Sequence, residues 1–325
     1  MSVIHYVTET WPSIGGVARY DTHIQLVFPD RKFFNAPEQR DQMIEYLKTC
    51  DNPVVLTDNH HACDVPNAYP VIIVHHGCAM TTAERNQIGP SIFTQVFVSG
   101  QIRMLEYRNP ENTWILSISK ACTDDFTRFC PVTYPKFKRI DLLHSSDFSE
   151  AAHKKNKFNV KRPRILGNWN NIKKGGHLIP TLTTLLPEFE FVQLCVLPRP
   201  DESLKSFNVR KQVEYLKSDM FLQVANSEGF SYASQDAMIC GLVPVCTNVG
   251  GFYGDVPDDC FTSLEWTKCY GDTTDYVYLT EKIRDAWENR EKISKNAREW
   301  YMTKCRFEDW ATTMKSIVAS MKNKN

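Results

Sequence analysis

One segment of the chain combines acidic residues with a glycine turn in a spacing that suits a phosphate and hydroxyl groups. Glu228 follows the short apolar run Met220–Val224, which we expect to be a strand. The next three residues lie where a helix should begin and offer main-chain amides to an anion: Gly229, Phe230 and Ser231. A helix N-terminus favours negative charge, because its first N–H groups have no partner within the helix. Asp236 lies eight positions after Glu228, about two turns further along roughly the same helix face.

Two acids at this spacing often lie on a solvent-exposed helix face. The neighbouring residues therefore have to distinguish such a face from a ligand-binding site. They include Gly-Phe, Cys-Gly-Leu-Val-Pro-Val and Val-Gly-Gly, which favour a site where Glu228 and Asp236 bind hydroxyls. A second glycine pair, Gly15 and Gly16, follows the first strand-like run and can let backbone amides approach an anion. Because this pair lacks the full G-x-G-x-x-G spacing, a plain turn stays an alternative.

The elements that position these residues are predicted to be alternating strands and helices. In the first half we expect strands in Ser2–Thr8, Asn52–Thr57, Val71–Val74, Thr94–Ser99 and Trp114–Ser119. In the second half we expect strands in Arg164–Gly167, Glu190–Leu197, Met220–Val224 and Val243–Thr247. Helices are expected in Tyr20–Phe28, His177–Leu186, Val209–Lys217, Gln235–Ile239 and, near the end, Thr280–Lys322. This alternation is typical of α/β architecture with doubly wound parallel sheets.

The pattern is interrupted once and then restarts, which predicts two domains. Residues 1–150 form the first series, and residues 151–163 are polar and basic, as in a linker. A solvated connector is favoured there over a phosphate-binding or membrane-binding patch. Residues 164–300 form the second series, and residues 301–325 are expected to be a C-terminal helix. Two such domains place a cleft where the carboxyl ends of their strands meet.

The segment around Glu228 resembles the E-x7-E region of retaining GT-B glycosyltransferases of family 4 (glycosyl transferases group 1). Further segments are similar to that family in the same order along the chain: Gly15–Arg19, Val74–Gly77, Ile118–Ala121, Ile165–Asn168 with Lys174–Gly175, and Phe307–Trp310. The resemblance implies two Rossmann-like domains, with an acceptor domain at residues 1–150 and a nucleotide-sugar donor domain at residues 164–300. The helix at 301–325 would pack back toward the first domain.

The resemblance also implies a hexosyltransferase with particular residue roles. Of the catalytic residues, His76 would reach the donor sugar, Glu228 would hold sugar hydroxyls and Lys174 would neutralise the diphosphate. The implied donor-binding residues are Gly15, Gly16, Gly229, Phe230, Ser231 and Asp236, the last on the ribose hydroxyls. The family usually has an arginine where this chain has Asn168, so Lys173 or Arg199 is expected to supply the missing charge. Asp236 replaces a glutamate and is shorter, which favours a longer or water-bridged contact.

The mechanism follows from the charge on the leaving group. Negative charge builds on the distal phosphate as the glycosidic bond breaks, and Lys174 with the amides of Gly16 and Ser231 would stabilise it. The resemblance implies front-face attack, in which the leaving phosphate takes the acceptor's proton. No cofactor is expected, and the reaction is expected to be metal-independent. GDP-mannose is favoured over a UDP-sugar as donor, and the acceptor is left open among glycan, lipid, protein and DNA.

A metal site is an alternative interpretation of two matching clusters, His60–Cys63 and His75–Cys78. Histidine and cysteine are good zinc ligands, but adjacent histidines rarely point at one ion and the spacing matches no common zinc site. A sugar contact is therefore favoured for His76. Aromatic residues that follow the donor segment, Trp266 and Tyr270 among them, are expected to pack in the core or on the surface rather than line an acceptor site.

Composition limits the classes of partner and compartment. The 325 residues carry 38 basic and 38 acidic side chains, which gives no general signal for nucleic acid or membrane. Eleven cysteines without C-x-x-C pairs are typical of a reducing, cytoplasmic compartment. Met1–Val7 does not have the pattern of a secretory signal, and no apolar run has the length of a membrane span, so a soluble chain, peripheral at most, is expected. A homodimer stays open, as does a bacterial or viral source.

Two other function classes stay open. A nucleotide-sugar epimerase on the same fold would need acid and base groups at the sugar carbon, which the sequence does not identify. The other is a non-catalytic GT-B module that only binds. Asn168 is the feature in favour of that module, whereas Glu228, Lys174 and His76 at matching positions count against it.

Overall fold

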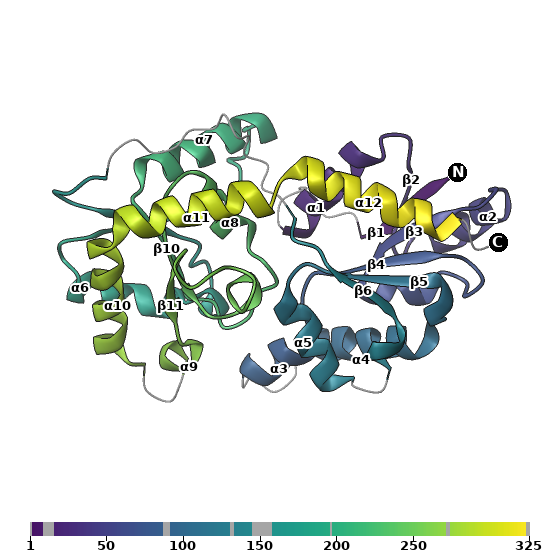
Figure 1. The fold of residues 1–325 in the computed structure, drawn as a ribbon, viewed down its shortest axis with the longest axis horizontal. Coiled ribbons are helices and arrows are strands. Elements are labelled where there is room, and N and C mark those ends of the chain that lie inside the picture. The colour runs from purple at the N-terminus through teal and green to yellow at the C-terminus, as the bar shows by residue number, and fades with distance from the viewer. Residues whose placement is uncertain are drawn as a thin grey trace. The chain divides into compact units, whose positions relative to one another are not determined.

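The chain divides into two compact units in a computed structural model (Figure 1). Unit 1 comprises Met1–His144 and Phe307–Asn325, and unit 2 comprises Ser145–Arg306. The structure describes residues 2–8, 16–86, 92–130, 133–144, 158–195, 197–270 and 274–322. No helix within these ranges has the length and apolar character that crossing a bilayer requires.

Unit 1 contains a six-stranded sheet in which each neighbouring pair of strands is parallel, in the order β2-β1-β3-β4-β5-β6. Its strands are β1 (Val3–Val7), β2 (Lys32–Asn35), β3 (Val54–Asp58), β4 (Val71–His75), β5 (Thr113–Ser117) and β6 (Lys138–Asp141). The chain leaves β1 toward one edge for β2 and returns past β1 to β3. The switch point, where ligands of open α/β sheets bind, therefore lies between β1 and β3.

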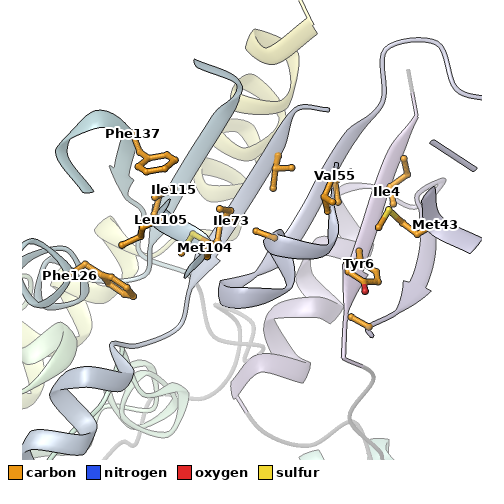
Figure 2. Close-up of a cluster of buried hydrophobic side chains, with 14 of the residues drawn as sticks. Ile4, Tyr6, Met43, Val55, Ile73, Met104, Leu105, Ile115, Phe126 and Phe137 are labelled. Carbon is orange, nitrogen blue, oxygen red and sulfur yellow. The ribbon is translucent and has the colours of Figure 1, made fainter. Parts of the chain in front are cut away.

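The central strands of unit 1 are buried on both faces, because successive side chains point to opposite sides of the sheet. Ile73 packs into one hydrophobic cluster, while its neighbours Ile72 and Val74 pack into the other. Figure 2 shows the first cluster, which Met104 and Phe126 help to close. The helices of unit 1 are α1 (Gly16–Val27), α2 (Arg40–Lys48), α3 (Ala79–Asn86), α4 (Ile92–Tyr107), α5 (Lys120–Phe129) and α12 (Phe307–Lys322).

Helices α1 and α12 cover the second cluster, although they are far apart in the sequence (Figure 1). Trp310 of α12 is buried against Tyr20 of α1, with their ring centroids 5.5 Å apart in an edge-to-face arrangement. Met314 and Val318 extend this contact along α12. The C-terminal helix thus belongs to the core of unit 1.

The strand predicted at Thr94–Ser99 is wrong, because this segment lies within α4. Its threonine, valines and phenylalanine have high β propensity, but packing overrides propensity here. Met104 and Leu105, further along the same helix, are buried in the cluster of Figure 2. Gly100 allows α4 to approach the chain after β3, since an added Cβ would lie 2.7 Å from the Cβ of His60.

Unit 2 contains a five-stranded sheet, again with parallel pairs throughout, in the order β11-β10-β9-β7-β8. Its strands are β7 (Arg164–Gly167), β8 (Glu190–Gln193), β9 (Met220–Gln223), β10 (Val243–Thr247) and β11 (Thr262–Leu264). Its helices are α6 (Ile179–Leu185), α7 (Leu204–Lys217), α8 (Tyr232–Ile239), α9 (Trp266–Cys269), α10 (Tyr276–Glu288) and α11 (Arg290–Lys304). The two doubly wound parallel sheets predicted from the sequence are confirmed.

Two domain boundaries predicted from the sequence can be compared with the elements of unit 2. Of the predicted linker 151–163, residues 151–157 lie outside the described residues. The rest is attached to unit 2, where Phe158 packs against Trp287 and the amide of Asn159 donates to Asp219 at 2.8 Å. The boundary placed at residue 300 falls inside α11, which ends at Lys304.

Candidate functional site

The loops that carry Lys174 and Glu228 follow the two strands at the switch point of unit 2. β7 and β9 are hydrogen-bonded neighbours, and the chain visits the edge strand β8 between them. Parallel strands end at the same edge of a sheet, so both loops emerge side by side. Lys174 ends the short 3₁₀ turn η4 (Ile172–Lys174), and Glu228 lies between β9 and α8.

The loop after β7, which carries Lys174 and is called the lysine loop below, is shaped by an asparagine side chain and a glycine. The side chain of Asn171 accepts a hydrogen bond from the amide of Lys174 at 3.1 Å. Gly175 then has a φ of 79°, in the left-handed region that favours glycine. An added Cβ there would lie 2.1 Å from Cγ2 of Val224, so the close approach to the end of β9 requires glycine.

Two further contacts fix this loop to β9. The amide of Asn226 donates to the carbonyl of Lys173 at 3.1 Å. The hydroxyl of Tyr270 lies 2.9 Å from the same carbonyl and 3.0 Å from that of Ile172, and it also contacts the carbonyl of Val224. Tyr270 therefore fixes the position of the lysine loop through hydrogen bonds, a role that the sequence did not suggest.

The loop that carries Glu228 packs against a second glycine turn, after β10. The amide of Gly251 donates to the carbonyl of Gly229 at 2.7 Å. Gly250 has a φ of 57°, and a Cβ there would lie 2.1 Å from the same carbonyl. A Cβ at Gly251 would lie 2.2 Å from the ring of Phe230. The Val-Gly-Gly signal in the sequence thus supports the shape of the Glu228 loop.

Lys174 and Glu228 form an ion pair, with side chains that are 29% and 16% exposed. The structure therefore brings together the ammonium group and the carboxylate that were predicted separately. Burial, and to a smaller extent the charge of Lys173, lowers the pKa of Lys174 to about 8. With a pKa of about 8, Lys174 is still mostly protonated at neutral pH.

The N-terminus of α8 lies directly after Glu228. Ser231 is the N-cap residue, and its carbonyl accepts hydrogen bonds from the amides of Ser234 and Gln235. Its hydroxyl makes no capping hydrogen bond. The ring of Phe230 is buried against Phe252, so its contribution to a ligand would come from the backbone. A helix start beside a lysine is well suited to a phosphate.

Asp236 is fully buried within α8, one helical turn or more from that N-terminus. Its carboxylate pairs with Nζ of Lys211 on α7 at 3.4 Å. Lys211 was not predicted as a site residue, because a lysine in a polar helix is normally expected to be exposed to solvent. The predicted contact between Asp236 and ribose hydroxyls stays a prediction.

The residues considered for the missing arginine lie around the same edge of the sheet. Asn168 directly follows β7, and its Oδ1 is buried without a hydrogen-bond partner among the described residues. Lys173 is exposed on the lysine loop, and Arg199 is exposed on the loop between β8 and α7. The amide of Arg199 donates to the carboxylate of Glu202 at 3.0 Å.

Two predicted site residues belong to the described part of unit 1. Gly16 is the first residue of α1, whereas Gly15 lies outside the described residues. His76 follows β4, and its Nε2 lies 3.1 Å from Oδ1 of Asp58 at the end of β3. Asp58 is a further residue that was missed, although a carboxylate directly after the apolar run of β3 is the same signal that identified Glu228.

In the part of the chain that the structure describes, no three His, Cys, Asp or Glu side chains are placed to hold a metal ion. His75 is buried and stacked on Phe126 at 4.0 Å, and burial lowers its pKa to about 3. Burial raises the thiol pKa of Cys63 and of Cys78, which disfavours the thiolate form that binds metals.

Comparison with known proteins adds information on the fold. No family model and no curated protein matches the sequence of the chain. Among solved structures, a sucrose-phosphate synthase from Thermosynechococcus elongatus has a TM-score of 0.72 at 11% identity, with 99% of each chain covered. HepE of Anabaena, in complex with UDP and glucose, has a TM-score of 0.67 at 12% identity, covering 98% of this chain and 100% of that one. The catalytic domain of Arabidopsis thaliana starch synthase IV, bound to ADP and acarbose, has a TM-score of 0.61 at 10% identity, with 99% of each chain covered.

These similarities extend over nearly the whole chain, and their low identities make them evidence on fold. The chain has the two-domain, Rossmann-like GT-B fold, as the sequence predicted. Function has to be argued from the site, because one fold supports many chemistries.

Proposed function

We propose that the chain is a glycosyltransferase that moves a sugar from a nucleoside-diphosphate donor to an acceptor. One observation carries the proposal: Lys174 and Glu228 meet at the switch point of unit 2, next to the N-terminus of α8. The ammonium group and helix amides suit a diphosphate, while the carboxylate suits sugar hydroxyls. The structural relatives support this class, since the names of two of them are those of sugar-transferring synthases and HepE was solved with UDP and glucose.

The proposed chemistry is stabilisation of the leaving group. As the bond to the sugar breaks, electrons move onto the distal phosphate, and Lys174 with the first amides of α8 absorbs that charge. Glu228 orients the sugar through its hydroxyls. The sequence resemblance adds that Gly16 and His76 also act on the donor, that configuration at the sugar carbon is retained, and that no metal takes part.

The donor is proposed as GDP-mannose, following the sequence resemblance, with a UDP-sugar as the second candidate. Relatives of the fold were solved with UDP and with ADP, so all three bases belong in the test. The acceptor class stays open among glycan, lipid, protein and DNA. The epimerase and the non-catalytic module stay alternatives that only an assay with product analysis separates.

The test is calorimetry of GDP, UDP and ADP, and of their sugars, against the wild type and Lys174→Ala. A hydrogen bond to a charged group is worth about 1.5–3 kcal/mol, so Lys174→Ala should weaken nucleoside-diphosphate binding roughly 10- to 150-fold. Lys268→Ala is the matched control, because Lys268 also pairs with an acid in unit 2 but is exposed. Absence of binding by every nucleotide would contradict the proposed function. Unchanged affinity in Lys174→Ala would assign the phosphate contact to another cation.

Glu228→Ala tests the catalytic half of the proposal. The variant should lose transfer while nucleoside-diphosphate affinity is retained or rises, since Glu228 acts on the sugar and its removal frees the charge of Lys174. Circular dichroism checks that the fold is retained. Near-normal turnover of the identified donor in this variant would refute the role of Glu228.

A further inference from the structure

Two pairs of ionisable side chains lie in unit 1, and the roles implied by the resemblance account for only one of these four residues. His76 lies 3.1 Å from Asp58, and Nε2 of His5 lies 3.3 Å from Oδ1 of Asp21 on α1. These residues come from β1, α1, β3 and the position directly after β4, at or beside the switch point between β1 and β3. The cluster is therefore assembled by the fold from separate parts of the sequence.

The tautomer of His5 follows from its neighbours. Nε of Arg31 donates to Nδ1 of His5 at 3.3 Å, so Nδ1 must carry a lone pair. The proton of His5 then lies on Nε2, facing Asp21. Nε2 of His5 thus faces Asp21, and the imidazole that contacts Asp58 directly is that of His76.

His76 is held in one orientation by two neighbours. Its Nε2 faces Asp58, and its ring meets that of Tyr20 edge-to-face with centroids 5.0 Å apart. The side chains of His76 and Asp58 are 13% and 12% exposed. Within the described residues, the contact to Asp58 is the only side-chain hydrogen bond of His76, which leaves Nδ1 for a ligand.

We propose that Asp58 is a positioning residue that holds His76 as an imidazolium and fixes its Nδ1–H as a donor to a hydroxyl of the bound sugar. The inference rests on the proposed transferase function and deepens it. Asp58 accepts the Nε2 proton, so the ring cannot flip without losing a buried ion pair. Asp21 adds a second negative charge near the ring and makes the loss of the proton less favourable.

The pKa directions agree with this arrangement. Burial lowers the pKa of His76, but the charge and hydrogen bond of Asp58, followed by the charge of Asp21, outweigh it and the pKa is raised. Burial raises the pKa of Asp58, but His76 outweighs it and the pKa is lowered. The imidazolium should therefore persist above pH ~6.5, the ordinary histidine pKa, and be lost as pH rises through the raised value.

The other titratable groups around the pair do not account for the raised pKa of His76. They are Tyr20 on α1, His75 on β4, His61 on the turn η1 (Asn59–Asp64), His5 on β1 and His144, whose ring meets that of Tyr20. Burial raises the pKa of Tyr20, and burial lowers that of His75 to about 3, so both are neutral near pH 7. Asp58 and Asp21 are the carboxylates that raise the pKa of His76.

The first experiment measures the pair without any nucleotide. Histidine resonances are titrated by NMR in the wild type, Asp58→Asn and Asp58→Glu, with His76→Gln to assign the signal. The imidazole pKa of His76 should lie above its ordinary value in the wild type and fall in Asp58→Asn, because the opposite charge is removed. Asp58→Glu keeps the charge and should retain a raised pKa. Asp64→Asn is the control, because Asp64 pairs with Tyr6 and Arg40 instead and should leave the His76 signal unmoved.

The second experiment asks whether the sugar is the ligand of His76. Calorimetry compares GDP-mannose with GDP, and UDP-glucose with UDP, from pH 6 to 9. Asp58→Asn should weaken binding of the nucleotide sugar about tenfold at pH 7.5 and leave the nucleoside diphosphate unchanged. Equal losses for both ligands, or a His76 pKa that does not move in Asp58→Asn, would overturn the inference. Failure of the wild type to bind any nucleotide would instead refute the proposed function.

Discussion

The ion pair between Lys211 and Asp236 permits a quantitative test of the core of unit 2. Its atoms lie 3.4 Å apart, and the two side chains are 10% and 0% exposed. Lys211→Met keeps the apolar stem of the side chain and removes its charge. The carboxylate of Asp236 then stays buried beside a thioether, and the free energy of unfolding should fall.

The expected loss is large because both groups are shielded from water. Two unit charges 3.4 Å apart attract by about 5 kcal/mol at an effective dielectric constant of 20. Removing one partner of a buried pair costs roughly 3–5 kcal/mol in measured cases. For a unit of this size each kcal/mol corresponds to about 2–4 °C, so the melting temperature of unit 2 should fall by roughly 6–20 °C.

The assay is urea unfolding and calorimetry of the wild type, Lys211→Met and the double variant Lys211→Met/Asp236→Asn. The double variant leaves no buried charge and should recover more than half of the loss. Lys217→Ala is the control on the same helix, since Lys217 is exposed and its pair with Glu214 should be worth less than about 1 kcal/mol. A loss below 1 kcal/mol in Lys211→Met, or a double variant as unstable as the single one, would refute the reasoning.

Two further predictions follow from packing. Gly175→Ala should weaken nucleotide binding about tenfold or more, because the left-handed backbone and the contact with Val224 force the lysine loop to move; Gly77→Ala, with no atom within 4 Å of the added methyl, should be tolerated. Equal affinity in the two variants, measured by calorimetry, would contradict this. Trp310→Ala should destabilise unit 1 by about 3–5 kcal/mol in urea unfolding, whereas Leu26→Ala, at a side chain that is 63% exposed, should change it little. Similar losses in both would show that α12 is not an essential part of the core.

The central strands could be predicted because their physical signal is local. β3, β4 and β10 are buried on both faces and appear as short apolar runs, so their predicted bounds agree with the structure within two residues. The prediction missed β11 in unit 2 and, in unit 1, β2 and β6, which read Lys-Phe-Phe-Asn and Lys-Arg-Ile-Asp. Both are edge strands of unit 1. An edge strand tolerates charge and needs one partner only, so its hydrophobic pattern is weak.

The residues of the candidate site were predictable as types, but their contacts were not. Glu228 was predicted from its position after an apolar run, and Lys174 from the family resemblance. Their ion pair depends on strand order, since β8 lies between β7 and β9 in sequence but not in the sheet. Asp58 has the same signal, a carboxylate at the end of an apolar run, but its contact with His76 depends on the pairing of β3 and β4. Lys211 was not predictable in this way, because only the packing of α7 on α8 reveals that it is buried.

The ion pair between Lys174 and Glu228 makes the asparagine at position 168, where the resembled family usually has an arginine, important for charge balance. Lys174 and Glu228 neutralise each other, so a diphosphate with its several negative charges needs at least one more source of positive potential. Lys173 is the nearer candidate in the chain, because its backbone is fixed by Asn226 and Tyr270 and only its side chain has to move. Arg199 lies on the separate loop after β8. The helix start at Ser231 contributes without any side chain, so a chain with one cation fewer can still hold a diphosphate if the Glu228 loop keeps its shape.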